Sequence, residues 1–259
     1  MYFLLLKACS CTSNFKNDTV YSLSMFHLIS GIKDVIKVIE GRFAFLECQY
    51  NDEFESALEA LGQIGSTIRG AELILSNAQS ASRHVISAAF DRQAHGRQLA
   101  ALEALGNIAG VTRSGNKILL NDSGEENLRR LMYENASMSS KLTPSGLFWA
   151  VLQQDSEVRI AAYKMLTALV ARPWCLIAIC TKQEIVNLVT DPHTETTKLG
   201  MDSKYDCCKA ILTSLQSSVA LDPSLTTIEK KLEEAVGRGP YSARYKSYAQ
   251  PLVLTADRF

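Results

Sequence analysis

The stretch ALEALGQI at residues 57–64 returns almost unchanged as ALEALGNI at residues 101–108, 44 positions later. Over the longer windows 57–77 and 101–121, 11 of 21 positions are identical without a gap. A period of roughly 40–47 residues is typical of armadillo and HEAT repeats, in which each helical unit buries its apolar side against the next. The repetition therefore predicts a stack of helical units.

Four stretches have the pattern of the inner helix of such a unit: a pair of small residues followed by apolar residues at helical spacing. They are residues 55–64, 99–109, 159–170 and 206–215. Gly62 and Gly106 share one mid-helix position, where glycine costs about 1 kcal/mol relative to alanine. Thr167 and Thr213 take the aligned place in the other two stretches. We expect this position to let neighbouring helices pack closely.

The segments between the inner helices predict further helices, bounded by turn residues. Glycine at 237 is the expected end of the last one. The predicted ranges are 68–77, 82–93, 112–121, 125–136, 145–154, 173–181, 183–190 and 224–237, with breaks at 122–124 and at 191–192. Period-two alternation is not sustained, so strands have little support. The expected fold is all-α, a right-handed α-solenoid of armadillo/HEAT-like repeats over residues 21–236, with an irregular N-terminus (1–20) and a flexible tail (237–259).

Composition excludes several classes of function. The 27 basic and 27 acidic residues balance, so no overall field draws the chain to nucleic acid or anionic lipid. The apolar run at residues 2–6 is shorter than a signal core or a membrane span, and we expect no membrane segment. The seven cysteines lack paired CxxC motifs, which favours reduced core thiols and a cytoplasmic location, with the nucleus as a second. Cys207-Cys208 takes the small-pair position.

No catalytic, metal or cofactor site is predicted. The four histidines form no HExxH motif, and there is no GxSxG elbow, glycine-rich phosphate loop or kinase motif set. The charged run at residues 125–130 indicates a solvated helix face with i,i+4 pairs, Glu125 with Arg129 and Glu126 with Arg130. Asp155 and Arg159 are expected to link adjacent repeats. Trp149 and Trp174 are interpreted as core residues rather than interface anchors.

Several segments together are similar to one known family. They are ALEALGNIA followed by GNKILL, SKLTPSGLFWAVLQQDSEVRIAAYKMLTALVARPW, KYDCCKAIL, and Gly239-Pro240-Tyr241. Across roughly residues 52–245 the chain resembles the family of the 26S proteasome non-ATPase regulatory subunit 5, armadillo/HEAT-like assembly chaperones of the proteasome base. Members are longer on the N-terminal side, so the resemblance implies the C-terminal half.

The resemblance implies a non-catalytic scaffold or chaperone that binds a proteasomal ATPase subunit through that subunit's C-terminal domain. It implies no cofactor, and we expect a monomer when the chain is free. A generic armadillo adaptor with a different client is the alternative, and a hydrolase or metal enzyme on an α-fold is a third hypothesis. Affinity purification separates the first two hypotheses.

Partner binding is expected on the solvent side of the inner helices, because these helices line a surface that can hold another protein. Their offset from the apolar face selects five candidate partner-binding residues. These are Glu59, Gln63, Glu103, Asn107 and Lys164.

Overall fold

A computed structural model describes residues 30–41, 43, 51–113, 118–217 and 225–241. The chain divides into two compact units, Met1–Val35 and Ile36–Phe259, and the second contains every helix labelled below. All regular secondary structure in the described ranges is helical. No helix in these ranges is long and apolar enough to cross a membrane. The all-α prediction is confirmed.

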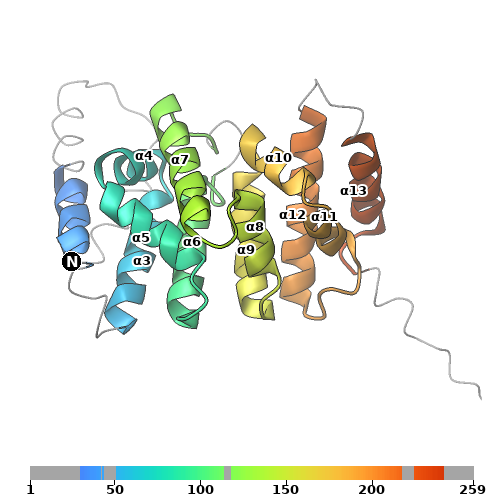
Figure 1. Ribbon diagram of the computed structural model, residues 1–259, viewed down its shortest axis with the longest axis horizontal. Coiled ribbons are helices and arrows are strands. Elements are labelled where there is room, and N and C mark those ends of the chain that lie inside the picture. Colours follow the sequence, from blue (N-terminus) through green and yellow to red (C-terminus); the bar gives the residue numbers. More distant parts are fainter. Residues whose placement is uncertain (1–29, 42, 44–50, 114–117, 218–224, 242–259) are drawn as a thin grey trace, which may run out of the picture. The chain divides into compact units, whose positions relative to one another are not determined.

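Four helices form the inner row of the second unit. They are α3 (Asn51–Gly65), α6 (His95–Ala109), α9 (Ser156–Leu169) and α12 (Lys198–Ser217). Each packs against the next in chain order, α3 on α6, α6 on α9 and α9 on α12 (Figure 1). The four predicted inner helices are therefore the helices that stack, as a repeat solenoid requires.

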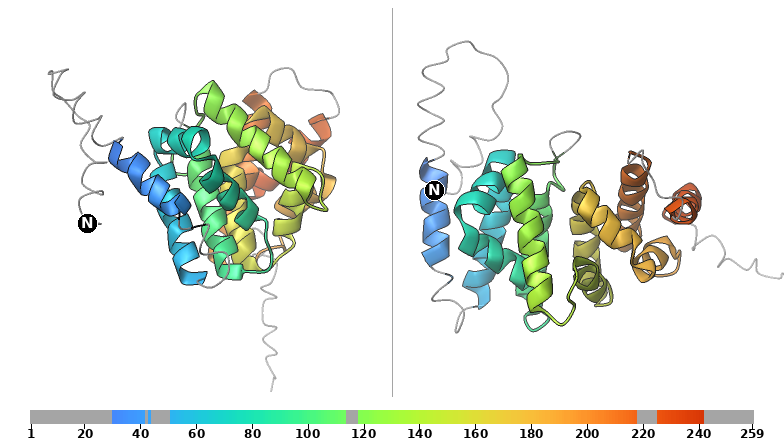
Figure 2. Two further views of the ribbon diagram at one scale, coloured as in Figure 1. Left: turned by 60° about the vertical axis from the view of Figure 1, so that its left-hand side comes forward. Right: turned by 45° about the horizontal axis from the view of Figure 1, so that its top comes forward.

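A helix over residues 30–41 precedes the inner row in the chain. Of the other helices, all but the last connect successive members of the row, and α13 follows α12. They are α4 (Ile68–Asn77), α5 (Gln79–Ala89), α7 (Asp122–Met138), α8 (Pro144–Leu152), α10 (Pro173–Cys180), α11 (Gln183–Thr190) and α13 (Thr226–Arg238). Figure 2 shows this order from two further directions. The groups α3–α5 and α9–α11 have three helices each, the armadillo layout expected from the sequence.

The short helix expected over residues 112–121 is not formed at its described residues. Residues 110–113 and 118–121 are turns or irregular, although the matching residues 68–77 form α4. Thr67 caps α4, because its side-chain oxygen accepts from the amide of Gly70. The aligned residue in the second copy is Val111, which has no oxygen to offer. The sequence similarity between the two copies therefore extends into residues that do not form the same structure in both.

Several helix bounds differ from the prediction: α12 begins at Lys198 rather than at residue 206, and α5 covers Gln79–Ala89 rather than 82–93. The helix α7 begins at Asp122 rather than after the predicted break at 122–124, since Asn121 accepts from the amide of Gly124 at 2.8 Å. The helix α13 runs through Gly237 to Arg238. Its C-cap is Gly239, at φ +73°, a backbone conformation that glycine adopts without a Cβ penalty. The helix therefore ends one residue after Gly237, and the glycine that caps it is Gly239 rather than Gly237.

Close approach of the inner helices is confirmed at one of the two aligned glycines. A Cβ built on Gly62 would lie only 2.8 Å from Ala104 Cα, whereas one on Gly106 would lie 3.5 Å from Met165 Cα. Thr213 is exposed and Leu212 is buried, so α12 is one residue out of the predicted alignment.

The ends of the chain lie largely outside the described residues. The predicted irregular segment 1–20 and the tail from residue 242 onward are among them. Gly239-Pro240-Tyr241 is described, and the Tyr241 hydroxyl donates to Asp202 Oδ1 of α12 at 2.5 Å. The start of the predicted tail is thus held against the last inner helix.

Candidate partner-binding face

The five candidate residues lie along three consecutive inner helices. Glu59 and Gln63 are on α3, Glu103 and Asn107 on α6, and Lys164 on α9. Four of them are exposed and Asn107 is half-buried. Because α3, α6 and α9 pack in this order, the structure places the candidates on neighbouring helices. Their role in binding stays a prediction.

One repeat position defines the centre of this face. It is occupied by exposed, charged residues on all four inner helices, Glu59, Glu103, Lys164 and Lys209. The residue just before it is buried in each helix, and so are those two and six places after it. These buried residues are Leu58, Leu61 and Gly65; Leu102, Leu105 and Ala109; Tyr163, Leu166 and Val170; Cys208, Ile211 and Leu215. The burial shared at these three flanking positions places the four charges at equivalent positions of their helices; we call them the inner-face charge row.

Lys209 is the member that the sequence prediction missed. The prediction aligned Cys207-Cys208 with the alanine pairs of α6 and α9, which shifts α12 by one residue. The burial of Cys208, Ile211 and Leu215 instead aligns Cys207 with Ala101. Spacing back from the apolar residues Ile211 and Leu215, rather than from the small pair, is the signal that would have found Lys209.

The inner-face charge row makes no ion pair and no side-chain hydrogen bond within the described residues. Several exposed or half-buried charges on or next to the connecting helices are paired. They form Arg83–Glu134, Arg129–Glu126, Arg130–Glu134 and Lys182–Glu184, with N–O distances of 3.2, 3.0, 2.9 and 3.4 Å. The four charges of the row therefore take no part in the ion pairs of the described residues and can pair with another protein.

Apolar side chains lie one helical turn before three members of the row. Leu99, Ile160 and Tyr205 each precede their charged residue by four places and are half-buried. Residues four apart share one face of a helix. The inner face thus combines a row of charges with partly accessible apolar surface, the composition expected of a protein interface rather than of a catalytic pocket.

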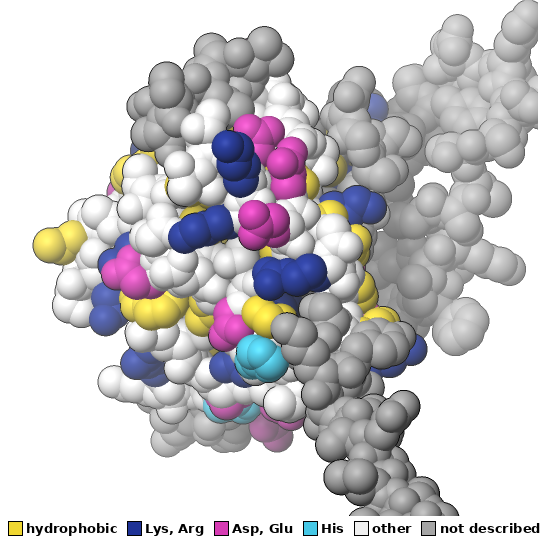
Figure 3. All heavy atoms as spheres, turned by 90° about the vertical axis from the view of Figure 1, so that its right-hand side faces the viewer, with side chains coloured by type: hydrophobic (Ala, Val, Ile, Leu, Met, Phe, Trp, Pro, Cys, Tyr) yellow, Lys and Arg dark blue, Asp and Glu magenta, His cyan; other side chains and the backbone are white. Residues whose placement is uncertain are grey.

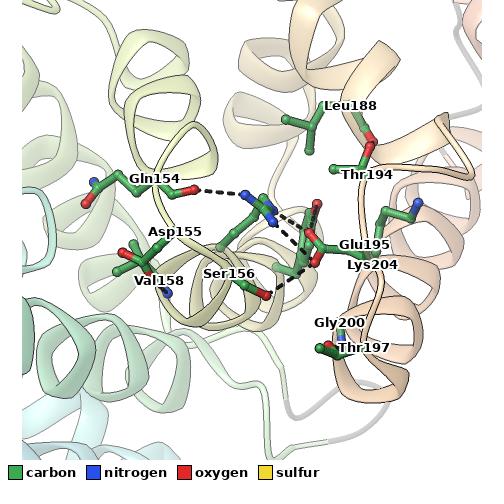
Figure 4. A network of polar contacts seen from close by, with 12 residues as sticks. Gln154, Asp155, Ser156, Val158, Leu188, Thr194, Glu195, Thr197, Gly200 and Lys204 are labelled. Atoms are coloured by element: carbon green, nitrogen blue, oxygen red, sulfur yellow. Dashed lines mark hydrogen bonds and ion pairs between the residues drawn. The ribbon is translucent and has the colours of Figure 1, made fainter.

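A buried polar network fixes the repeat junction beside Lys164. Arg159 donates to both carboxylate oxygens of Glu195, which lies between α11 and α12 and has a side chain only 1% exposed (Figure 4). The Tyr163 hydroxyl donates to the same carboxylate at 3.1 Å. The hydrogen bond to Glu195 raises the pKa of Arg159, and burial raises the pKa of Tyr163 well above its ordinary value. The predicted linking role of Arg159 is confirmed.

A second junction links the N-termini of α6 and α9. Asp155 caps α9 by accepting from the amides of Glu157 and Val158. Its other carboxylate oxygen lies 3.6 Å from His95 Nδ1, while His95 Nε2 lies 3.3 Å from Glu157 Oε2. The predicted link through Asp155 is therefore also present, and Glu157 is already paired.

The predicted pairing of the charged run 125–130 is wrong. Glu125 pairs with Arg172, the largest fully buried side chain, through contacts of 2.7 and 2.9 Å. Arg129 instead pairs with Glu126, three residues earlier. Glu125 also accepts from the amide of Leu120 at 2.8 Å, which ties the loop before α7 to the third repeat. Glu125 is therefore a half-buried anchor, whereas Glu126 and Arg129 lie on the exposed face that the sequence predicts.

The described cysteines are buried free thiols, as expected. They are Cys175, Cys180, Cys207 and Cys208. Burial raises the pKa of all four, to about 11 for Cys180 and for Cys208, so they are poor nucleophiles at neutral pH. No group of three or more potential metal-ligating residues occurs within the described ranges. Trp149 and Trp174 are half-buried, and Trp174 packs edge-on to Tyr133 at 6.1 Å.

The surface at the C-terminal end shows no single-sign patch. In Figure 3 this end of the molecule faces the viewer, and basic and acidic side chains are interspersed on it. This mixture agrees with the balanced composition of the chain. Nucleic acid, which attracts surfaces of concentrated positive charge, is therefore a poor match for this face.

Comparison with known proteins places these observations in a family context. A family model described as proteasome non-ATPase 26S subunit matches residues 32–252. The 26S proteasome non-ATPase regulatory subunit 5 of Bos taurus is 24% identical over 222 residues, which is 84% of this chain and 40% of that protein. The chain thus spans about two fifths of the length of the curated relative that it matches. No solved structure matches the chain significantly.

Proposed function

Because the chain belongs to the family of proteasome non-ATPase 26S subunits, we propose that it is a protein-binding scaffold for assembly of the proteasome regulatory particle. It acts by reversible binding and not by catalysis. The observation that carries the proposal is the family match over residues 32–252. The name of the bovine relative, a non-ATPase regulatory subunit, supports the non-catalytic part.

The proposed partner is a proteasomal ATPase subunit, held on the inner face. That face is supported by exposed residues on consecutive stacked helices, Glu59, Gln63, Glu103 and Lys164, and by half-buried Asn107 beside them. Charges that the fold leaves without an internal partner are available to a second protein. Such charges give an interface specificity and a fast association rate more than raw affinity.

Affinity purification of the tagged full chain tests this function. We expect recovery of proteasomal ATPase subunits without subunits of the mature 20S core, because an assembly factor leaves before the particle is complete. Recovery of unrelated cargo with no ATPase subunit would overturn the proposal and favour a generic armadillo adaptor. The control variant K231E/E234K reverses two exposed charges on α13. It should recover the same proteins as the wild type.

We further propose that the chain works in the cytoplasm and the nucleus. The buried free thiols support a reducing compartment. Fluorescence microscopy of the tagged chain at native expression tests the location, and accumulation in the secretory pathway would contradict it.

A further inference from the structure

The inner-face charge row changes sign once along the stack. Glu59 on α3 and Glu103 on α6 are acidic, whereas Lys164 on α9 and Lys209 on α12 are basic. All four residues occupy the same repeat position and are exposed. Opposite charges on the two halves of one row give the face a direction, which a surface of uniform or random charge does not have.

Two exposed acidic residues also lie on the basic half, Glu157 on α9 and Asp206, three residues before Lys209, on α12, and Asp206 reduces the positive charge at that end. Glu157, two turns before Lys164, is paired with His95. Asp52, in the first turn of α3, adds negative charge at the end where Glu59 lies. The row itself has no ion pair among the described residues. Its charges are therefore available to an outside partner.

The spacing of the row suits one helix laid across the inner helices. Packed helices lie about 8–10 Å apart, so four of them in succession place the first and last charges roughly 25–30 Å apart. An α-helix rises 1.5 Å per residue, so about 17–20 residues cover that distance. The half-buried side chains of Leu99, Ile160 and Tyr205, one turn before three of the charges, give such a helix an apolar strip to cover.

We propose that the inner face binds one amphipathic helix of its partner in a fixed direction, with basic residues over α3 and α6 and acidic residues over α9 and α12. Charge complementarity selects this occupant, because a helix of one charge sign would meet repulsion over half of its length. The inference rests on the proposed function for the identity of the partner, a proteasomal ATPase subunit. It does not rest on that function for the chemistry of the helix.

Synthetic helices of 20 residues serve as probes for the full-length chain. The first carries a leucine stripe, glutamates in its N-terminal half and lysines in its C-terminal half, an order that also suits the helix dipole. The second has the same composition with the two charges alternating along its length. Fluorescence anisotropy at low salt should show tighter binding of the first peptide, and the difference should shrink as salt screens the charges.

Charge reversal on the protein gives the sharper test. E59K/E103K should weaken binding of the first peptide about tenfold, since two attractive contacts become repulsive, and K164E/K209E should do the same. The fourfold variant E59K/E103K/K164E/K209E is again bipolar and should restore the affinity to within about threefold. The K231E/E234K variant of α13 is the control and should bind like the wild type.

The direction of binding can be read by cross-linking. A photoreactive residue at the lysine end of the first peptide should label α3 and α6 of the wild type, and α9 and α12 of the fourfold variant. Circular dichroism melts confirm that each variant is folded, which is expected because all four positions are exposed. Equal affinity for both peptides, or labelling that does not move, would overturn the inference.

Two outcomes separate this inference from the proposed function. If E59K/E103K recovers ATPase subunits as well as the wild type does, the inference fails and the assembly function stands. If the wild type recovers no ATPase subunit but still binds the first peptide with the expected charge dependence, the function fails and the directional face stands.

Discussion

The two aligned glycines of the repeat should respond in opposite ways to the same substitution. Gly62 and Gly106 occupy the same place in ALEALGQI and ALEALGNI, and both lie inside inner helices. A Cβ at position 62 would lie 2.8 Å from Ala104 Cα and 3.1 Å from its Cβ. At position 106 the nearest atom would be Met165 Cα at 3.5 Å, an ordinary contact.

The magnitudes follow from these distances. Alanine in place of a mid-helix glycine contributes about 0.5–1 kcal/mol through helix propensity, and nothing opposes that gain at Gly106. At Gly62, α3 and α6 must separate by roughly 1 Å to bring carbon–carbon contacts to about 3.5–4.0 Å. Overpacking of this kind costs about 1–3 kcal/mol. Gly62→Ala should therefore lower the free energy of unfolding by up to about 2.5 kcal/mol, and Gly106→Ala should raise it by about 0.5–1 kcal/mol.

Urea titration and thermal melting of the two variants measure this difference. One kcal/mol corresponds to about 2–4 °C in Tm for a domain of this size class, so the two midpoints should move apart by several degrees. The wild type and the double variant complete the set, and any departure from additivity measures the coupling through α6, which both seams share. Shifts of the same sign in both single variants would refute the packing argument.

Three further perturbations test the interior of the stack. Glu125→Gln leaves the buried guanidinium of Arg172 without its anion and should lower the free energy of unfolding by about 3–5 kcal/mol; an unchanged urea midpoint would contradict the pairing. Ala162→Glu places a charge at a fully buried seam position and should cost several kcal/mol, so unaltered thermal melting would count against the register. Because burial raises the pKa of the Cys180 and Cys208 thiols from 9.0 to about 11, the folded chain keeps protons that the unfolded chain loses in that window, and stability should fall as pH rises from 9 to 11. C180A/C208A should lose less stability over that range, and a loss equal to that of the wild type would exclude these thiols as its cause.

The inner row could be predicted from the sequence because its helices are coded locally. Small and apolar residues recur at helical spacing through 99–109 and 159–170, and the burial pattern of α6 and α9 follows that spacing. Helices α4, α5, α10 and α11 were also found, because capping and breaking residues such as Thr67 and Asp191 lie in the sequence itself.

The sequence prediction is wrong where a contact between residues far apart in the sequence, or a single capping residue, determines the structure. Glu125 has helical neighbours of the right sign, yet it pairs with Arg172, 47 residues away, and no local pattern contains that contact. In α12, three polar or charged residues near the helix start, Asp202, Ser203 and Lys204, are buried or half-buried. The ammonium group of Lys204 donates to the carbonyl of Asp191. Burial of a lysine at a core position obscures the apolar period, and the small pair Cys207-Cys208 then suggested the wrong alignment.

The one-residue error in α12 matters more for function than for fold. Either alignment predicts a fourth inner helix on the same stack, since α9 and α12 pack in both. Only the observed alignment brings Lys209 to the repeat position of Lys164. The row then has two acidic residues followed by two basic residues. Packing constrains the buried positions and leaves the exposed one free, so charge at that place can vary without a cost in stability. We therefore expect this solenoid to recognise its protein partner through exposed residues that contribute little to the stability of the fold.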